Sequence, residues 1–80
     1  MRSDPDLAAS AARGHEADFA ELVRRHQARV RGMARRLTGS VSDGDDIAQA
    51  TFLKAWQKIG SYAGGTFSAW VCTICWREYL

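Results

Sequence analysis

SDGDDIAQATFLKAW, residues 42–56, has the spacing of an amphipathic helix. Ser42 or Asp43 is available as the N-cap, and the three carboxylates of the first turn favour the positive end of a helix dipole. At about 100° per residue, one face is apolar and another mixes an acid, an amide and a leucine. We predict that the first face packs in the core and that the second is a docking surface. The apolar face holds Ala48, Phe52, Ala55 and Ile59, and the mixed face holds Asp46, Gln49 and Leu53.

The chain has 80 residues, of which 46% are hydrophobic, and a formal charge of +2. This length predicts one small domain, residues 1–80, with a single core. The net charge is too small to indicate a partner, but its distribution is uneven. Six arginines fall between Arg24 and Arg36, whereas Asp43, Asp45 and Asp46 form an acidic cluster. The arginines are expected to form either a solvated face or a contact to phosphates or an acidic partner.

The first thirteen residues lack the apolar segment of a signal peptide. The longest apolar run, around residues 69–76, is far too short to span a bilayer. We therefore expect a cytoplasmic protein that makes no membrane contact of its own.

Two cysteines, Cys72 and Cys75, have the C-x-x-C spacing of some metal and redox sites. Zinc would need two further ligands, and the two histidines, His15 and His26, lie far back in the sequence. A thioredoxin-like site would need a βαβ context, which this sequence lacks. The pattern favours small side chains packed in a helix over metal or redox chemistry. We expect no metal, no cofactor and no catalytic residue.

Two further helices are predicted ahead of the quoted stretch. A Ser-Asp-Pro start at residues 3–5 and a stop at Gly14 indicate a short helix, interpreted as a mobile lid because its apolar stripe is thin. From about residue 17 to 38, apolar positions recur at i, i+3, i+4 and i+7, and Gly39 supplies the stop. His26 falls on the apolar face of this long helix. It is interpreted as a satisfied core or boundary residue, with a catalytic base as the alternative.

The residues after the quoted stretch predict a flexible, glycine-rich loop at 60–65 and a final helix that starts near Thr66. Trp76 falls on the outer side of this helix, toward solvent or a partner. No stretch alternates with period two, so the expected fold class is all-α, a small bundle of about four helices. The helical pattern still runs at Leu80, and the chain is therefore interpreted as a fragment of a longer protein. The inward positions of the last helix are Phe67, Trp70, Val71 and Ile74.

Four motifs follow one another with consistent gaps: Phe19-x-x-Leu22-Val23-x-x-His26, Ala34-Arg35-Arg36-Leu37-Thr38-Gly39, Asp43-x-x-Asp46-Ile47-x-Gln49-x-x-Phe52-Leu53-x-x-Trp56, and Gly65-x-Phe67-x-x-Trp70-Val71-x-x-Ile74. Taken together they resemble region 2 of bacterial sigma factors of the extracytoplasmic-function type, from about Asp4 onward. The resemblance implies a helical domain that binds the clamp helices of the β′ subunit of core RNA polymerase. It also implies that the domain recognises and helps to open the promoter minus-ten element. An anti-sigma factor is a further implied partner, and the family's second DNA-binding domain, region 4, is missing from this chain.

The resemblance assigns polymerase binding to the third helix. There Asp46 and Gln49 would hydrogen-bond to a basic coiled coil, and Leu53 would add apolar area. Asp43 and Asp45 would attract the basic partner by their charge. Trp56 would either close the core or contact the partner. The expected polymerase-binding residues are Asp43, Asp45, Asp46, Gln49, Leu53 and Trp56.

Promoter binding is assigned to the loop and the last helix. An extruded base of the single-stranded non-template strand would be held by Tyr62, and the outer edge of the last helix would stack or hydrogen-bond. Two lysines, one helical turn apart, would contact phosphates near the loop. The expected DNA-binding residues are Lys54, Lys58, Tyr62, Thr73, Trp76 and Arg77.

Some positions depart from the family pattern. Gly44 and Ala50 stand where the family commonly has alanine and glutamate, and we expect a small weakening of docking or of the helix start. Two other function classes remain. One is a general DNA-binding helical module that uses the Arg24–Arg36 stripe, and the other is an enzyme or redox protein centred on His26 or on the two cysteines. The second lacks a nucleophile, base and orienting acid at suitable spacing.

Overall fold

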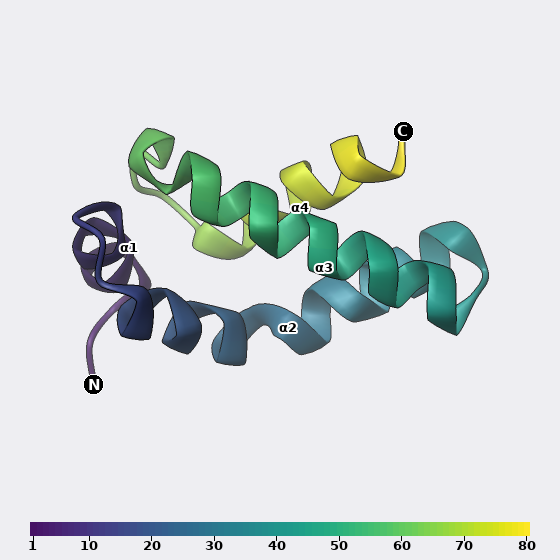
Figure 1. Cartoon of the computed structure of the whole chain (residues 1–80), viewed down its shortest axis with the longest axis horizontal. Helices are drawn as coiled ribbons and strands as arrows, with labels where there is room; N and C mark the ends of the chain where they lie inside the picture. The colour runs from purple at the N-terminus through teal and green to yellow at the C-terminus, as the bar shows by residue number, and fades with distance from the viewer.

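The computed structural model describes residues 1–80, and most of them are helical (Figure 1). No residue forms a strand, which confirms the predicted all-α bundle. None of the helices is both long enough and apolar enough to cross a membrane. The elements in chain order are α1 (Asp4–Ala12), α2 (Glu16–Thr38), α3 (Val41–Lys58), the 3-10 turn η1 (Ile59–Ser61) and α4 (Phe67–Tyr79).

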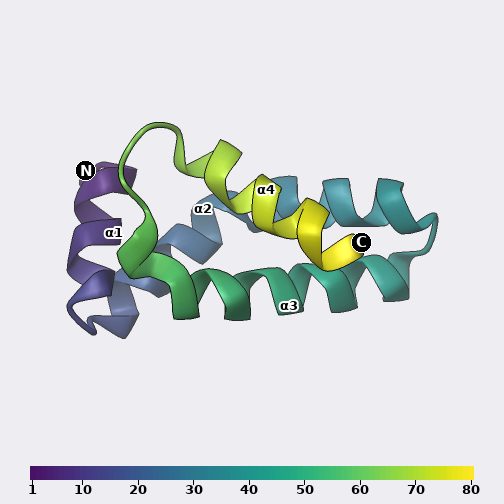
Figure 2. The same ribbon diagram turned by 90° about the horizontal axis from the view of Figure 1, so that it is seen from above.

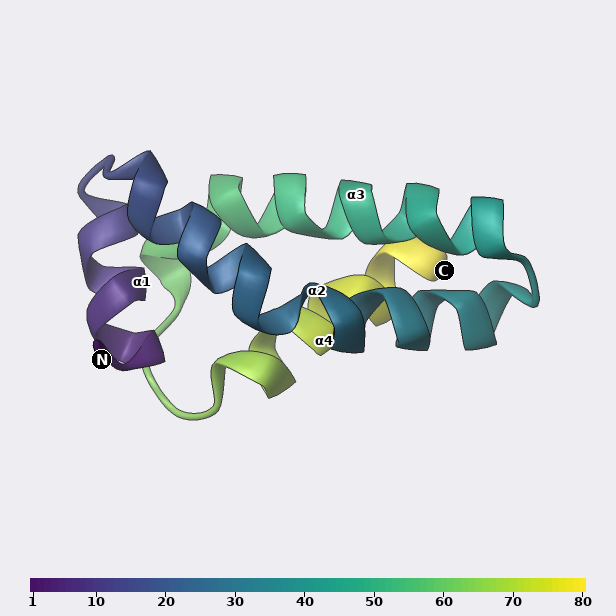
Figure 3. The same ribbon diagram turned by 90° about the horizontal axis from the view of Figure 1, so that it is seen from below.

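The antiparallel pair of α2 and α3 forms the long axis of the molecule (Figures 1 and 3). The 23 residues of α2 account for most of the longest extent, 35 Å. Between the two helices the chain reverses at Gly39, whose φ of 69° is left-handed and whose N–H donates to the carbonyl of Arg35. Ser40 then caps α3 by accepting a hydrogen bond from the N–H of Asp43. The predicted cap at residue 42 or 43 was therefore wrong by two or three residues, and only Asp43 of the three acids lies in the first turn.

Gly44 lies at a close approach between α3 and α2. A Cβ at this position would lie 2.6 Å from Cγ and 2.7 Å from Cα and N of Arg35. Since a real Cβ does not come so close to backbone atoms, this approach requires glycine. The missing side chain was expected to weaken the helix start, and it also permits the two helices to pack together.

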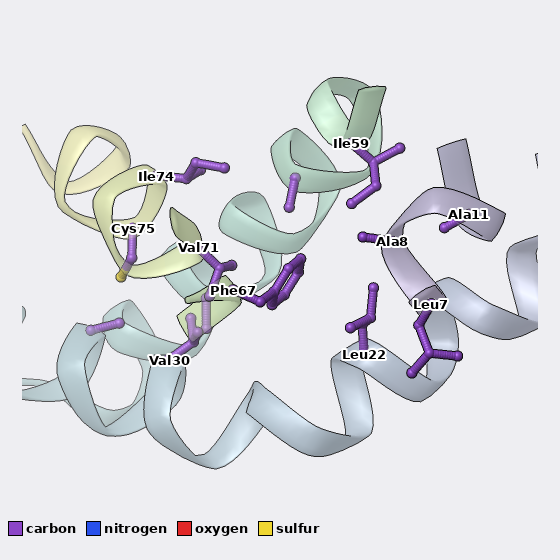
Figure 4. Close-up of a cluster of buried hydrophobic side chains, with 13 residues drawn as sticks. Leu7, Ala8, Ala11, Leu22, Val30, Ile59, Phe67, Val71, Ile74 and Cys75 are labelled. Atoms are coloured by element: carbon purple, nitrogen blue, oxygen red, sulfur yellow. The ribbon is translucent and has the colours of Figure 1, made fainter. Parts of the chain in front are cut away.

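The fourth helix lies across one side of the α2–α3 pair and completes the core (Figure 2). Its inward side chains lie close to Val30 of α2, and the predicted inward residues Phe67, Val71 and Ile74 are buried (Figure 4). Cys75 is fully buried as well, which confirms the packing interpretation for this cysteine. Burial raises the pKa of the Cys75 thiol above its ordinary value.

The first helix stands crosswise at one end of the bundle (Figures 2 and 3). The mobile-lid prediction was wrong, because Leu7, Ala8 and Ala11 are all buried in the common core. Alanine side chains offer a thin stripe, but they let α1 approach its neighbours closely, so a narrow apolar face is enough to dock it. Ser10 adds polar contacts at the turn into α2, where its hydroxyl donates to the carboxylate of Asp18.

Asp4 joins the start of α1 to the middle of α2. Its carboxylate accepts hydrogen bonds from Arg25 Nη1 at 3.0 Å and His26 Nε2 at 2.8 Å. Partial burial opposes ionisation of Asp4, but the hydrogen bonds and positive charge of these partners outweigh it, so the pKa of Asp4 lies below its ordinary value. His26 also packs its ring on Phe67, with centroids 5.0 Å apart. It is a satisfied boundary histidine, as predicted.

Substitution of Gly44 tests the helix approach. We expect Gly44→Ala to lower the free energy of unfolding by about 1–2 kcal/mol, because the overpacking penalty exceeds the gain of about 1 kcal/mol in helix propensity. Gly32→Ala is the matched control, since a Cβ there meets only the flexible end of Arg36, at 3.3 Å. It should stabilise the protein. Urea unfolding followed by circular dichroism measures both, and a stabilised Gly44→Ala variant would contradict the close approach.

The Asp4 contacts predict a dependence of stability on pH. A carboxyl whose pKa is lowered by folding stabilises the native state above its unfolded pKa, here ordinarily 3.8, and this contribution is lost as the pH falls through the lower folded value. The difference in unfolding free energy between wild type and Asp4→Asn should therefore be full at about pH 6 and shrink as the pH falls below 3.8. Urea titrations above and below this pH measure it. Asp6→Asn, on the same turn of α1 but without an ion pair, should show a smaller difference at about pH 6.

Candidate functional site

The predicted docking surface is free on the outside of α3. Asp46, Gln49 and Leu53 are all exposed, and Leu53 retains 60% of its accessible surface. Neither Asp46 nor Asp43, which is also exposed, forms an ion pair within the chain. The opposite side of α3 carries the buried Ala48 and Ala55, as the periodicity predicted. We refer to Asp46, Gln49 and Leu53 as the docking face.

Asp45 differs from the other acids of this cluster. Its two carboxylate oxygens accept hydrogen bonds from Arg35 Nε at 2.9 Å and Arg35 Nη2 at 3.1 Å. This bidentate pair lies at the surface, beside the close approach at Gly44, and joins α3 to α2. The negative charge of Asp45 is thus partly neutralised within the chain, and its predicted steering role is weaker than that of Asp43 or Asp46.

An aromatic hollow adjoins Leu53. It has a volume of ≈ 330 Å³ and opens to solvent between α2 and α3. The ring centroids of Phe19 and Trp56 lie 5.1 Å apart at one side of it. Trp56 was expected either to close the core or to contact a partner, and its half-buried ring both packs on Phe19 and lines the open hollow. We call this the aromatic hollow; its lining residues are Glu16, Phe19, Phe52, Leu53 and Trp56.

Phe52 of α3 and two residues of α2 in this hollow were not among the predicted site residues. Phe19 was placed on the core face of its helix by periodicity, and Glu16 was not singled out. Both come from α2, and nothing in the local pattern says that they meet Leu53 and Trp56 of α3. A second groove of ≈ 360 Å³ continues along the two helices and brings Gln27 and Arg31 of α2 beside Gln49.

The outer edge of α4 carries the other predicted contacts. Trp76 is 45% exposed, and its ring lies 5.9 Å from that of Tyr79. Arg77 is exposed and forms no ion pair. The hydroxyl of Thr73 donates to the carbonyl of Ala69 in its own helix, so it is left free only to accept. An aromatic face and an unpaired guanidinium are therefore both exposed on the last turns of α4.

Tyr62 is more constrained than the loop prediction implied. Its ring packs against Phe67 at 5.4 Å and Trp70 at 5.5 Å, and its hydroxyl donates to the carbonyl of Gly65. Burial, and then the charge of Asp4, raise the pKa of the Tyr62 phenol. The turn at Gly64 and Gly65, with φ of 101° and 78°, brings that carbonyl within reach. The structure thus holds Tyr62 in place beside α4.

The basic side chains divide into paired and unpaired sets. Lys54 and Lys58 have no carboxylate partner and lie on a flank of α3 beside the docking face. Within the α2 stripe, Arg24 and Arg25 bond Glu21, and Arg35 bonds Asp45. Half of the six arginines therefore face an acid of the same chain. The stripe is less basic than the sequence suggested.

The groups considered for enzymatic or metal chemistry have structural partners. His26 bonds Asp4, and Cys75 lies in the core with its thiol beside the hydroxyl of Thr51. No group of three or more His, Cys, Asp and Glu side chains is arranged to hold a metal ion. No catalytic arrangement emerges from these residues.

The sequence of this chain is similar to one family model and to several known proteins. The family model described as Sigma-70 region 2 matches residues 22–80. The ECF RNA polymerase sigma factor SigE of Mycolicibacterium smegmatis is 38% identical over 60 residues, which cover 75% of this chain and 23% of that protein. The RNA polymerase sigma factor CnrH of Cupriavidus metallidurans is 36% identical over 90% of this chain and 38% of its own length.

A third relative, the RNA polymerase sigma factor CarQ of Myxococcus xanthus, is 37% identical over 76% of this chain and 36% of its own length. The chain therefore spans less than two fifths of the length of each of these relatives. No solved structure gave a significant match.

Proposed function

The chain belongs to the sigma-70 family, as a region 2 domain of the extracytoplasmic-function type, and from this premise we propose how its faces divide the work of transcription initiation. Sigma factors of this family are transcription initiation factors and not enzymes, in agreement with the expectation that the chain is non-enzymatic. In this proposal, α3 binds core RNA polymerase and α4 with the preceding loop binds promoter DNA.

The observation that carries the polymerase part is the docking face beside the aromatic hollow. Asp46 and Gln49 offer unpaired acceptors and an amide donor, while Leu53 and the hollow next to it provide apolar area. A basic coiled coil, such as the clamp helices of the β′ subunit, has the complementary chemistry. Charged groups at the rim give register and apolar groups at the centre give affinity.

The DNA part rests on the outer edge of α4. Trp76 and Arg77 present a stacking surface and a phosphate or base contact, and Lys54 and Lys58 add positive charge on α3. Single-stranded DNA is bound by such combinations of aromatic faces and basic side chains. The domain would recognise the minus-ten element and help to open it by capturing unstacked bases of the non-template strand, which needs no bond chemistry and no bound nucleotide.

Two further parts of the proposal follow from the family alone. An anti-sigma factor would inhibit the domain by covering the polymerase and DNA faces, and the site of action would be the cytoplasm. A general duplex-binding module built on the α2 arginines is the less favoured alternative. The pairing of Arg24, Arg25 and Arg35 with acids of the chain removes much of the charge that such a module needs.

Removal of the polar groups of the docking face tests polymerase binding. Asp46→Ala combined with Gln49→Ala should weaken binding to core RNA polymerase by at least about tenfold, equivalent to about 1.4 kcal/mol, because the partner's charged groups lose their acceptors. Retention on immobilised core enzyme and a fluorescence titration measure this. Asp6→Ala, which also removes one exposed carboxylate, is the control and should bind normally. Normal retention of the double variant would refute the assignment.

Truncation of Trp76 tests the DNA edge. Trp76→Ala should weaken binding of the holoenzyme to a single-stranded minus-ten oligonucleotide by about 5- to 150-fold, which corresponds to the loss of one base–aromatic stack. Trp76→Phe keeps an aromatic face and should recover most of the affinity. Fluorescence anisotropy of a labelled oligonucleotide measures both variants. Equal affinity of Trp76→Ala and wild type would remove Trp76 from the proposed site.

A further inference from the structure

The first helix lies outside the residues matched by the family model, which begin at Leu22, yet it contacts the segment that leads to the proposed DNA edge. Its N-terminus reaches the centre of α2 through Asp4, as described above. Its other contacts run to η1, whose last two residues begin the segment 60–65, called the loop below. The contact through Asp4 and His26 leads to Phe67, and Phe67 packs on Tyr62 of the loop.

A continuous series of side chains joins Asp4 to the loop. Asp4 bonds His26 at 2.8 Å, and the ring of His26 packs on Phe67 with centroids 5.0 Å apart. Phe67 is the first residue of α4 and is almost fully buried. It packs edge-on against Tyr62, which in turn bonds the carbonyl of Gly65. The first three contacts join α1 to α2, α2 to α4 and α4 to the loop, so none of them is a consequence of one helix alone, and the last lies within the loop.

The body of α1 also forms a wall beside the loop. Ala8 lies on the side of α1 that faces Ile59 of η1 (Figure 4). A hollow of ≈ 260 Å³ separates the outer alanines of α1 from Tyr62 and Gly64. Asp4 is near enough for its charge to contribute to the raised pKa of Tyr62.

We propose that α1 positions the loop for single-stranded DNA, with Asp4 and His26 as the positioning residues that anchor it. The inference rests on the proposed function, because it concerns the same DNA edge. The loop contains three glycines, and a free loop of this composition loses much conformational entropy when it is ordered. Ordering it before DNA arrives removes part of that loss from the binding step, so affinity rises without any contact between α1 and DNA.

Hydrogen exchange tests the positioning role without DNA. In Asp4→Asn, exchange of the amides of residues 60–66 should accelerate by on the order of threefold or more beyond any acceleration in the centre of α3, where exchange follows the global free energy of unfolding. Asp6→Asn removes a neighbouring carboxylate of α1 that has no ion pair, and it should leave loop exchange unchanged. Ala9→Leu fills the hollow between α1 and the loop and should slow loop exchange.

Oligonucleotide affinity tests the consequence for function. Asp4→Asn in the holoenzyme should bind the single-stranded minus-ten oligonucleotide about fivefold more weakly, with unchanged retention by core polymerase. Unchanged loop exchange in both Asp4→Asn and Ala9→Leu would overturn the inference, and so would uniformly faster exchange across all helices in Asp4→Asn. Faster loop exchange with unchanged affinity would also overturn it. If the wild-type holoenzyme binds no oligonucleotide, the proposed function fails, and the exchange measurements still decide whether α1 orders the loop.

Discussion

The close approach of α2 and α3 at Gly44 is the constraint on which the other surfaces depend. With no side chain between them, the backbone of Arg35 lies directly against α3, and Asp45 comes within bidentate reach of the same arginine. This contact sets both the separation and the register of the two longest helices. Phe19 consequently meets Trp56 at the far end of the pair, where the aromatic hollow forms. The docking face is oriented outward by the same register.

The structure separates two binding functions on neighbouring elements. The docking face and the aromatic hollow use α3 with the start of α2, whereas the proposed DNA edge uses α4 and the loop. Lys54 and Lys58 lie on a flank of α3 beside the docking face, without acidic partners. Half of the six arginines of the α2 stripe form internal ion pairs, which are individually weak at the surface but partly neutralise the charge that a phosphate contact would need. Acidic and basic surfaces thus serve different proposed partners.

The errors made from sequence have identifiable physical causes. The cap of α3 was assigned to residue 42 or 43 because both residue types favour that position, but the tight turn after Gly39 brought Ser40 into the capping geometry first. The first helix was expected to be mobile because its apolar stripe is thin. Alanines bury little area each, yet their small size lets α1 pack closely against α2 and η1, and the Asp4 ion pair adds a polar anchor. Tyr62 was expected in a flexible loop, and the rings of Phe67 and Trp70 hold it instead.

The sequence by itself determined the helices, their inward and outward faces and the resemblance to sigma region 2, because periodicity, capping residues and motif spacing are local properties of the chain. Only the tertiary structure decided which side chains from separate helices meet. The Arg35–Asp45 pair, the meeting of Phe19 with Trp56, and the series from Asp4 through His26 to Tyr62 all join residues on different elements. Their distances depend on helix separation and register. The separation and register of the helices follow from packing at Gly44 and at the small residues of α1. The pattern of a single helix cannot predict this packing.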